Sequence, residues 1–340
     1  MKESISKITR RQFLQILGGG IGAGLLMKTG LNRWRSIKNP LVVQHAKPLL
    51  GTMATITLHH PDFEEGQKAM IDAFAAIEKV DRIMSLHRRD SDLSRINQMA
   101  GREIVRVDSS LCDILQTAKE FYGRTEGAYD VTCLPMLKLY GLYANESEKQ
   151  HYPSDKIIQQ TLDVVGSKFI FIDPIKNEAG LTHEGSAIDL GSIGKGYAAD
   201  RAIDALHKVG IENALIDIGG NMVAIGFPQT EEGSRQGWKV AIRNPVVGTE
   251  EPYFETLLLK NESVATSGNY EQMHWLDGRK LGHLFDMRSG QYSNGGTSAT
   301  VVAKNGTLSD ALSTSIFLMG PKGKKHFSDV AKDIYFHGFS

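Results

Sequence analysis

The sequence S-A-I-D-L-G-S-I-G-K-G-Y-A-A-D-R-A-I-D-A-L, residues 186–206, constrains the fold and the chemistry of this chain more than any other stretch. A short apolar run, which predicts a strand, ends at Asp189, and three glycines follow within six positions with Lys195 between the last two. Apolar residues at helical spacing come next, so we expect a strand, a glycine loop and the start of a helix. Such a loop can hold a phosphate, because glycines admit close backbone approach and the amides at a helix N-terminus point at an anion. An ordinary strand-to-helix turn explains the same pattern, and the remainder of the chain has to decide between the two.

Composition sets the class of protein. The chain has 340 residues, 41% of them apolar and 23% charged, as in globular proteins with a substantial core. Its formal net charge is zero, so nothing favours nucleic acid or an acidic surface as a partner. The two cysteines, Cys112 and Cys133, match the spacing of neither a disulfide framework nor a metal cluster.

The N-terminus predicts export. Residues 9–15 read T-R-R-Q-F-L-Q, and an apolar, glycine-rich run of about a dozen residues follows, which is short for a membrane-spanning helix. This pattern is typical of a twin-arginine signal over 1–28, followed by a linker over 29–40 and one domain over 41–340. No A-x-A cleavage site is evident, so the segment could persist as a weak membrane anchor; a basic, unstructured N-terminus is the alternative.

The pattern of elements predicts an α+β fold: a single two-lobed domain with a largely antiparallel sheet and flanking helices. We expect helices over 65–84, 109–122 (with Ser110 and Asp113 at capping-box spacing) and 308–319, where T-L-S-D predicts a second capping box. The run 127–132 is strand-like. Short strands separated by glycine and asparagine turns are predicted at 214–221, 222–226, 238–242, 256–260, 263–268 and 298–303.

The last of these helices carries a second candidate site. Asp310 and Thr314 are four residues apart, hence on one helical face, with Ser313 beside them. A carboxylate and a hydroxyl that converge in this way suit Mg²⁺, which prefers oxygen ligands. A capping aspartate and a threonine bonded to its own helix would give the same spacing.

Eight segments, taken in order, resemble the FAD:protein FMN transferase (ApbE) family over nearly all of the chain that follows the N-terminal signal and linker. They are L-L-G-T (49–52), M-S-L-H-R-R-D-S-D-L-S-R-I-N (84–97), G-A-Y-D-V-T (127–132), I-D-L-G-S-I-G-K-G-Y-A-A-D (188–200), D-I-G-G-N (217–221), S-V-A-T-S-G-N-Y (263–270), G-H-L-F-D-M-R-S-G (282–290) and S-D-A-L-S-T (309–314).

The resemblance implies Mg²⁺-dependent transfer of FMN from FAD to a threonine of an acceptor protein, with release of AMP, outside the cytoplasmic membrane. It implies an acceptor that is a subunit of a membrane redox complex or a flavoprotein reductase. The positions that would contact FAD are Leu50, His87, Ala128, Tyr129, Asp130, Asp189, Lys195 and Phe285. Mg²⁺ would be held by Asp310, Thr314 and the backbone carbonyl of Ser192. His283 is a candidate for proton transfer or phosphate binding, and Asp310 is a second candidate base.

Two departures from the family pattern bear on the site. The usual D-P-x-T-G is D-M-R-S-G (286–290) here, so we expect a looser turn in which Ser289 still supplies a hydroxyl. Position 313 is serine where some members have a second aspartate, which leaves the metal site with one charge fewer.

Other functions share parts of the pattern. Residues 194–199 satisfy G-x-G-x-x-A, but they sit late in the chain without the βαβ alternation of a nicotinamide-binding domain. A Walker A loop is excluded because Gly196, not Ser or Thr, follows Lys195. An FAD pyrophosphatase, with water as the acceptor, and a non-catalytic FAD carrier both remain compatible with the sequence.

Overall fold

The computed structural model describes residues 41–143, 151–228, 236–246, 249–269, 273–293 and 296–338. The predicted signal and linker, residues 1–40, lie outside this part of the chain. The elements are β1 (Leu41–Leu49), β2 (Thr52–His60), α2 (Phe63–Met84), α3 (Asp92–Gln98), β3 (Val105–Arg106), α4 (Ser109–Arg124), α5 (Leu134–Leu139), α6 (Asp155–Leu162), β4 (Ile170–Asp173), β5 (Glu178–Leu181), α7 (Gly194–Lys208), β6 (Ala214–Ile218), β7 (Asn221–Ile225), β8 (Trp238–Arg243), β9 (Tyr253–Leu259), β10 (Glu262–Gly268), β11 (His274–Leu276), β12 (Arg279–Leu281), β13 (Phe285–Asp286), β14 (Gln291–Tyr292), β15 (Ser298–Ala303), α8 (Gly306–Met319), α9 (Pro321–His326) and β16 (Asp333–His337).

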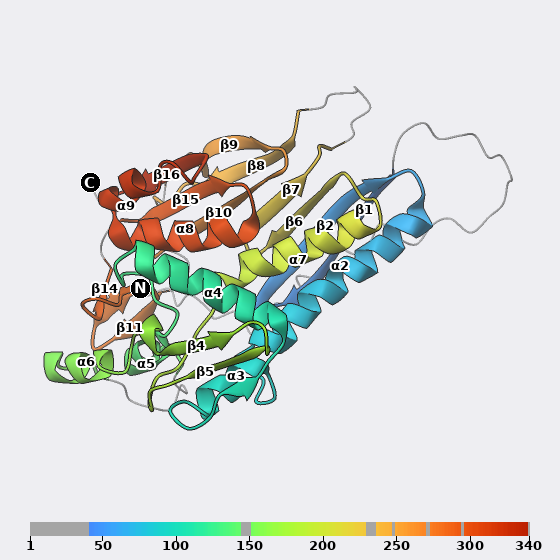
Figure 1. Cartoon of the computed structure of the whole chain (residues 1–340). Helices are drawn as coiled ribbons and strands as arrows, with labels where there is room; N and C mark the ends of the chain where they lie inside the picture. The colour runs from blue at the N-terminus through green and yellow to red at the C-terminus, as the bar shows by residue number, and fades with distance from the viewer. Residues whose placement is uncertain are drawn as a thin grey trace, which may run out of the picture. The chain divides into compact units, whose positions relative to one another are not determined.

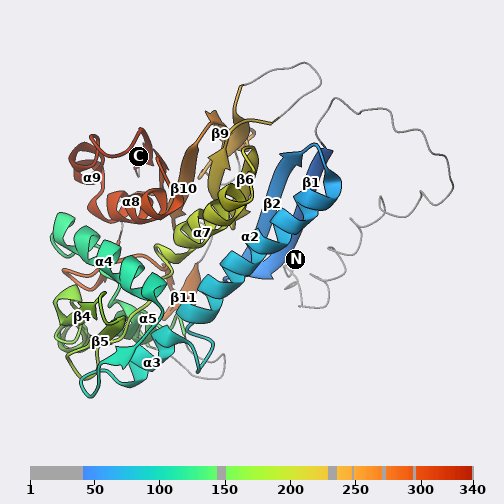
Figure 2. The same ribbon diagram turned by 45° about the vertical axis from the view of Figure 1, so that its right-hand side comes forward.

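A seven-stranded sheet forms the centre of the fold, in the order β1-β2-β6-β7-β10-β15-β16. Every pairing within it is antiparallel. Helices α2 and α7 lie side by side over one end of this sheet and α8 lies against β10 and β15, as two views show (Figures 1 and 2). The α+β class and the largely antiparallel sheet predicted from the sequence are therefore confirmed.

The sheet is covered on both faces in its central part. Side chains alternate along β7: Val223 and Ile225 belong to the main core with α7, whereas Ala224 packs with Trp238 and Val240 of the β8–β9 hairpin. This alternation follows from the two-residue repeat of a strand. It means that α7 and α8 occupy one face of the sheet and β8–β9 the other.

Two tight hairpin turns meet at one end of the sheet. Leu50 and Gly51 join β1 to β2, and Gly219 and Gly220 join β6 to β7; all four residues have positive φ, between 53° and 90°. Positive φ at both central positions is the geometry of a type I′ turn, which matches the twist of paired strands. A Cβ atom on Gly219 would lie 2.6 Å from the hydroxyl oxygen of Thr52, so the two turns are in contact.

Two local predictions of strands were wrong. Residues 127–132 and the run before Asp189 form no strand; only one isolated parallel bridge, Cys133 to Ala187, connects these segments. Their backbones meet where too few residues are extended to build a ladder.

The N-caps also differ from the predicted capping boxes. Asp108, not Ser110, caps α4, and Asn305 caps α8 by accepting a hydrogen bond from the amide of Leu308. In both cases a better acceptor lies just upstream of the serine or threonine.

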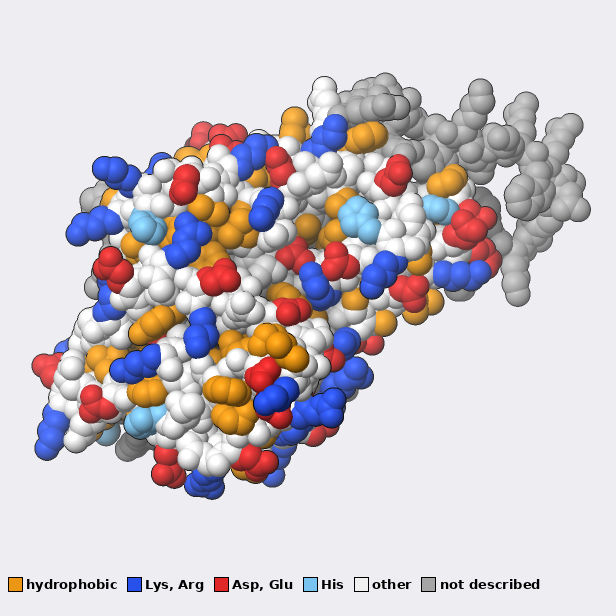
Figure 3. Space-filling model, viewed as in Figure 1, with side chains coloured by type: hydrophobic (Ala, Val, Ile, Leu, Met, Phe, Trp, Pro, Cys, Tyr) orange, Lys and Arg blue, Asp and Glu red, His pale blue; other side chains and the backbone are white. Residues whose placement is uncertain are grey.

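Figure 3 shows lysine, arginine and acidic side chains interspersed on the face that it displays, without a large area of one sign. Within the described part of the chain, no helix combines the length and the apolarity that crossing a membrane requires.

Candidate active site

A cavity of about 1000 Å³ opens beside the two hairpin turns. Its walls come from segments far apart in the sequence: the two turns, the end of α2, the loop that leads into α7, strands β8 and β10, residues 283–287 and the first half of α8. Cavities of this size accommodate large cofactors as well as smaller ligands.

The cavity brings together all but one of the residues proposed for the site. The residues that line it are Leu50, His87, Tyr129, Asp130, Asp189, Ser192, Lys195, His283, Phe285, Asp310 and Thr314. Ala128 does not line it: this residue is fully buried behind the wall, where its carbonyl accepts a hydrogen bond from the amide of Met287 at 3.4 Å. The side chain of Ala128 therefore does not contact a ligand bound in the cavity.

The loop before α7 is shaped by its own polar groups. The carboxylate of Asp189 accepts the amide of Gly191 at 2.6 Å and the hydroxyl of Tyr143. The ammonium of Lys195 donates to the carbonyl of Gly191 at 3.1 Å, which holds the cation over the loop. Burial raises the pKa of Tyr143 well above its ordinary value, and the neighbouring negative charge of Asp189 raises it further, so this phenol stays protonated. His87 stands beside Tyr143, with ring centroids 6.5 Å apart.

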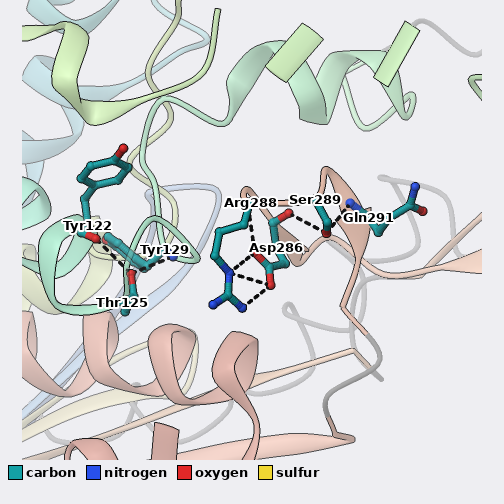
Figure 4. Close-up of polar contacts among 7 residues, drawn as sticks. All are labelled: Tyr122, Thr125, Tyr129, Asp286, Arg288, Ser289 and Gln291. Carbon is teal, nitrogen blue, oxygen red and sulfur yellow. Dashed lines mark hydrogen bonds and ion pairs between the residues drawn. The ribbon is translucent and has the colours of Figure 1, made fainter. Parts of the chain in front are cut away.

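Tyr129 and Asp130 serve the protein's own structure as well as the cavity. The amide of Tyr129 donates to the hydroxyl of Thr125 at 3.0 Å (Figure 4). Its phenol accepts the hydroxyl of Ser192 at 3.1 Å. Burial raises the pKa of this phenol far above its usual range. The carboxylate of Asp130 accepts four hydrogen bonds, two from Thr132 and two from Ser167, at 2.7–3.0 Å. Little hydrogen-bonding capacity of Asp130 is left for a ligand.

The turn at 286–290 is closed without the proline that the family usually has. Gly290 and Ser289 donate their amides to the carbonyl of Asp286 at 2.8 and 3.1 Å. The side chain of Arg288 forms a bidentate ion pair with the carboxylate of Asp286, and the Ser289 hydroxyl accepts the amide of Gln291 at 3.2 Å (Figure 4). An ion pair and backbone hydrogen bonds thus close this turn in the absence of a proline ring.

The first turns of α7 and α8 are in contact at two glycines. A Cβ atom on Gly196 would lie 2.0 Å from the carbonyl oxygen of Gly306 and 2.8 Å from the Cβ atom of Asp310. The amide of Gly196 donates to Asp310 Oδ2 at 2.9 Å. Because no side chain separates the helices, the aspartate of α8 sits directly against the glycine loop of α7.

A second carboxylate fixes this crossing. Asp200 of α7 accepts the amides of Gly306 and Thr307 at 2.6 and 2.8 Å and the Thr307 hydroxyl at 2.5 Å, and so satisfies the first amides of α8. Burial raises the pKa of the Asp200 carboxyl above its ordinary value, although the hydrogen bonds from Thr307 and Gly306 oppose the shift.

A chain of hydroxyls orients Thr314. Ser313 donates its hydroxyl proton to the carbonyl of Asp310 at 2.9 Å, and Ser267 of β10 lies 2.9 Å from the hydroxyls of both Ser313 and Thr314. A hydroxyl has one proton. Since that of Ser313 is used, Ser267 must donate to Ser313, and Thr314 must donate to Ser267. The lone pairs of Thr314 are then left for another partner.

The oxygen atoms of Asp310 and Thr314 fit a hard cation. Asp310 is 3% exposed, and none of the lysines, arginines or histidines that the structure describes forms an ion pair with it. A buried carboxylate is stabilised by hydrogen bonds or by a cation, and the hydrogen bond from Gly196 occupies only one lone pair of Asp310. The described residues contain no group of three or more His, Cys, Asp or Glu side chains arranged to hold a metal. A metal here would therefore bind one carboxylate together with neutral hydroxyl and carbonyl oxygens, which is a donor set that Mg²⁺ accepts.

The polar residues that line the cavity but were not predicted as site residues include Tyr143, Asn221 and Ser267. Asn221 and Ser267 lie within two of the segments that carry the family resemblance, D-I-G-G-N and S-V-A-T-S-G-N-Y. That resemblance was the available signal. Their roles depend on contacts with distant segments, which spacing within one segment does not reveal.

Comparison with known proteins identifies the family of this chain. The sequence profile of the ApbE family matches residues 50–335. The chain is 29% identical to the FAD:protein FMN transferase of Vibrio cholerae serotype O1 over 277 residues, 80% of each chain. It is 27% identical to the FAD:protein FMN transferase of Escherichia coli K12, over 72% of this chain and 69% of the relative.

Solved structures of ApbE proteins have a similar fold. The ApbE protein of Thermotoga maritima superposes with a TM-score of 0.76 at 28% identity, covering 87% of this chain and 94% of the other. The flavin transferase ApbE of Vibrio cholerae superposes with a TM-score of 0.75 at 27% identity, covering 88% and 97%. The family match spans most of the chain and the site lies within it. This chain belongs to the ApbE family.

Proposed function

We propose that this protein transfers FMN from FAD to a threonine hydroxyl of an acceptor protein and releases AMP. The observation that carries the proposal is the meeting of Asp310, Thr314 and the Lys195 loop in one large cavity of a chain similar to FAD:protein FMN transferases. The flavin nucleotide would lie along the wall formed by Leu50, Asp189 and Phe285.

The balance of the reaction is simple. The threonine oxygen bonds to the phosphorus on the FMN side of the pyrophosphate, the bond from that phosphorus to the bridging oxygen breaks, and AMP leaves with the bridging oxygen. The hydroxyl proton passes to a base, for which His283 and Asp310 are the candidates that line the cavity. Such chemistry depends mostly on positioning and on neutralising charge.

Residues of this chain supply both the positioning and the neutralising charge. Lys195 brings a cation to the loop, and Asp310, Thr314 and the carbonyl of Ser192 would hold Mg²⁺. When bound, Mg²⁺ stabilises the negative charge on the phosphoryl oxygens. Tyr129 and Tyr143 stay protonated, because burial raises the pKa of both phenols, and so add no negative charge beside the phosphates.

We further propose that the protein acts outside the cytoplasm. The twin-arginine pattern at residues 9–15 supports export to the periplasm or to the outer face of the cytoplasmic membrane, with weak membrane association if the N-terminal segment is retained. The acceptor would then be a subunit of a membrane redox complex that exposes its threonine on that side.

The experiment is incubation of the protein with FAD and Mg²⁺, with and without a candidate acceptor, followed by mass spectrometry of the acceptor and chromatography of the nucleotides. A mass gain of one FMN with equimolar AMP supports the transferase. Free FMN and AMP without a modified acceptor would instead indicate a pyrophosphatase, and unchanged FAD a carrier.

Two variants sharpen the test. Asp310→Ala should reduce AMP release by roughly 100-fold or more, because the only charged ligand of the proposed metal is lost. Asp204→Ala is the control: this carboxylate lies on the solvent side of α7, where it pairs with Arg201, and its loss should leave the rate unchanged. Full activity of Asp310→Ala at low Mg²⁺ would contradict the metal assignment.

A further inference from the structure

Asn221 presents a buried hydrogen-bond donor that the fold does not use. This residue opens β7 directly after the Gly219–Gly220 turn and is 4% exposed. Its side-chain Nδ2 is buried and has no acceptor among the described residues, yet Asn221 lines the cavity. Buried polar groups are almost always hydrogen-bonded, because an unmet donor destabilises the folded state.

The backbone of the same turn is satisfied within the protein. The amide of Gly219 donates to the carbonyl of Met53 at 3.1 Å, and the amide of Gly220 donates to the carboxylate of Asp217 at 2.8 Å. These two glycines therefore have no free main-chain amide to donate to a ligand. The donor that remains is the side chain of Asn221.

The strand places Asn221 at the corner that holds Asp310. Val223, two residues further along β7, points to the helical face of the sheet, where a Cβ atom on Gly306 would lie 2.8 Å from its side chain. Residues i and i+2 of a strand share a face, so Asn221 lies on the same face, about one repeat of 6–7 Å nearer the cavity. Gly306 precedes Asp310 by about one turn of α8, and both Asn221 and Asp310 line the cavity.

We propose that Asn221 Nδ2 donates a hydrogen bond to a phosphoryl oxygen of the dinucleotide, an inference that rests on the proposed function and names a further binding residue for it. Lys195, the first turn of α7 and the oxygens of Asp310 and Thr314 define this corner as the place for a phosphate and its metal. An anionic oxygen is the acceptor that gains most from a buried, preorganised amide.

The test compares the stability and the affinity of Asn221 variants. Asn221→Leu keeps the approximate size of the side chain and removes its polar atoms, whereas Asn221→Ala removes the donor without added bulk. If the donor is reserved for ligand, the unliganded Asn221→Leu protein should have a melting temperature equal to or above that of the wild type. Titration calorimetry at fixed Mg²⁺ should show both FAD and ADP binding to both variants roughly 10- to 100-fold more weakly.

Asn97→Leu is the matched control. Both polar atoms of Asn97 are used within the fold, since it accepts the amide of Ile188 at 2.7 Å and donates to its carbonyl at 2.9 Å. Its replacement should lower the melting temperature of the unliganded protein, which shows that the assay detects the loss of an amide that the fold does use.

Several outcomes would overturn the inference. A melting temperature of unliganded Asn221→Leu that falls as far as that of Asn97→Leu would make Asn221 structural. Binding of FAD within twofold of the wild type in both Asn221 variants would show that no bond is lost, and unchanged ADP binding with weakened FAD binding would move the acceptor away from the phosphates. If the wild-type protein binds ADP and FAD but releases no AMP, the proposed reaction is refuted, while weaker binding by both Asn221 variants would still support the role of Asn221.

Discussion

Replacement of Gly196 by alanine tests whether the contact between α7 and α8 builds the site. The new Cβ atom would lie 2.0 Å from the carbonyl oxygen of Gly306 and 2.5 Å from its carbonyl carbon. Ordinary contacts require about 3.4–4 Å, and backbone cannot rotate aside as a flexible side chain can, so the two helices must separate by more than 1 Å.

The expected cost combines three contributions. Overpacking costs about 1–3 kcal/mol. The hydrogen bond from the amide of Gly196 to the carboxylate of Asp310, now 2.9 Å long, is worth about 1.5–3 kcal/mol if separation breaks it. The higher helix propensity of alanine returns about 1 kcal/mol. We therefore expect Gly196→Ala to lower the free energy of unfolding by about 1.5–5 kcal/mol and to weaken Mg²⁺-dependent AMP release, because Asp310 is displaced.

The assay is urea unfolding of the ligand-free protein, paired with AMP release as Mg²⁺ is varied. Gly123→Ala is the control, because Gly123 also lies within a helix, α4, and a Cβ atom there would meet nothing within 4 Å. That variant should be as stable as the wild type or slightly more stable, by up to about 1 kcal/mol. A free energy of unfolding for Gly196→Ala within 0.5 kcal/mol of the wild type, roughly the scatter of surface substitutions, would refute the reasoning.

Three further predictions concern other side chains. Ser267→Ala should raise the Mg²⁺ concentration for half-maximal AMP release about 5-fold, because Thr314 loses the acceptor that orients its hydroxyl; an unchanged Mg²⁺ dependence would argue against the hydroxyl chain. Asp130→Ala should lower the free energy of unfolding by about 3 kcal/mol or more, measured in urea, because the groups that donate to this carboxylate are left buried without an acceptor. Burial lowers the pKa of His59 below 6.5, so the unfolded chain takes up a proton at a higher pH than the folded protein does. The free energy of unfolding of the wild type should therefore decrease as the pH falls from 7 to 5, and His59→Phe should make this decrease smaller. Melting curves of both proteins across this range are the measurement, and equal slopes would show that His59 does not contribute; some slope should remain, because burial lowers the pKa of His337 as well.

Local patterns predicted most of the secondary structure, since the signal lies within each segment. The apolar periodicity over 65–84 predicted α2, and the short runs at 214–221 and 263–268 predicted β6 and β10. The predictions that were wrong depended on distant partners. The run before Asp189 is apolar because it is buried beside Cys133, not because it pairs in a sheet.

In the candidate site, too, features that depend on distant contacts could not be predicted. Resemblance of motifs named residues that the structure places around one cavity, but it named Ala128 with them, whose side chain lies behind the wall. Whether the amide of Asn221 is used or free depends on what surrounds it after folding. Spacing along the chain likewise could not show that Gly196 touches Gly306, since the two are brought together by the packing of α7 on α8.

The dispersed origin of the cavity walls also orders events during synthesis. Leu50 lies near the beginning of the described chain, whereas Asp310 and Thr314 lie near its end. A growing polypeptide that has reached Lys304 already contains the glycine loop and the flavin-side residues, yet it lacks both side-chain ligands of the proposed metal and α8, one of the two helices against which α7 packs. Contacts between such distant segments form late, because the entropy cost of closing a long loop comes before the stabilisation that the contacts provide. The dinucleotide can therefore be captured only after translation of this region is complete, and a fragment cut anywhere between the two walls should carry no binding activity of its own.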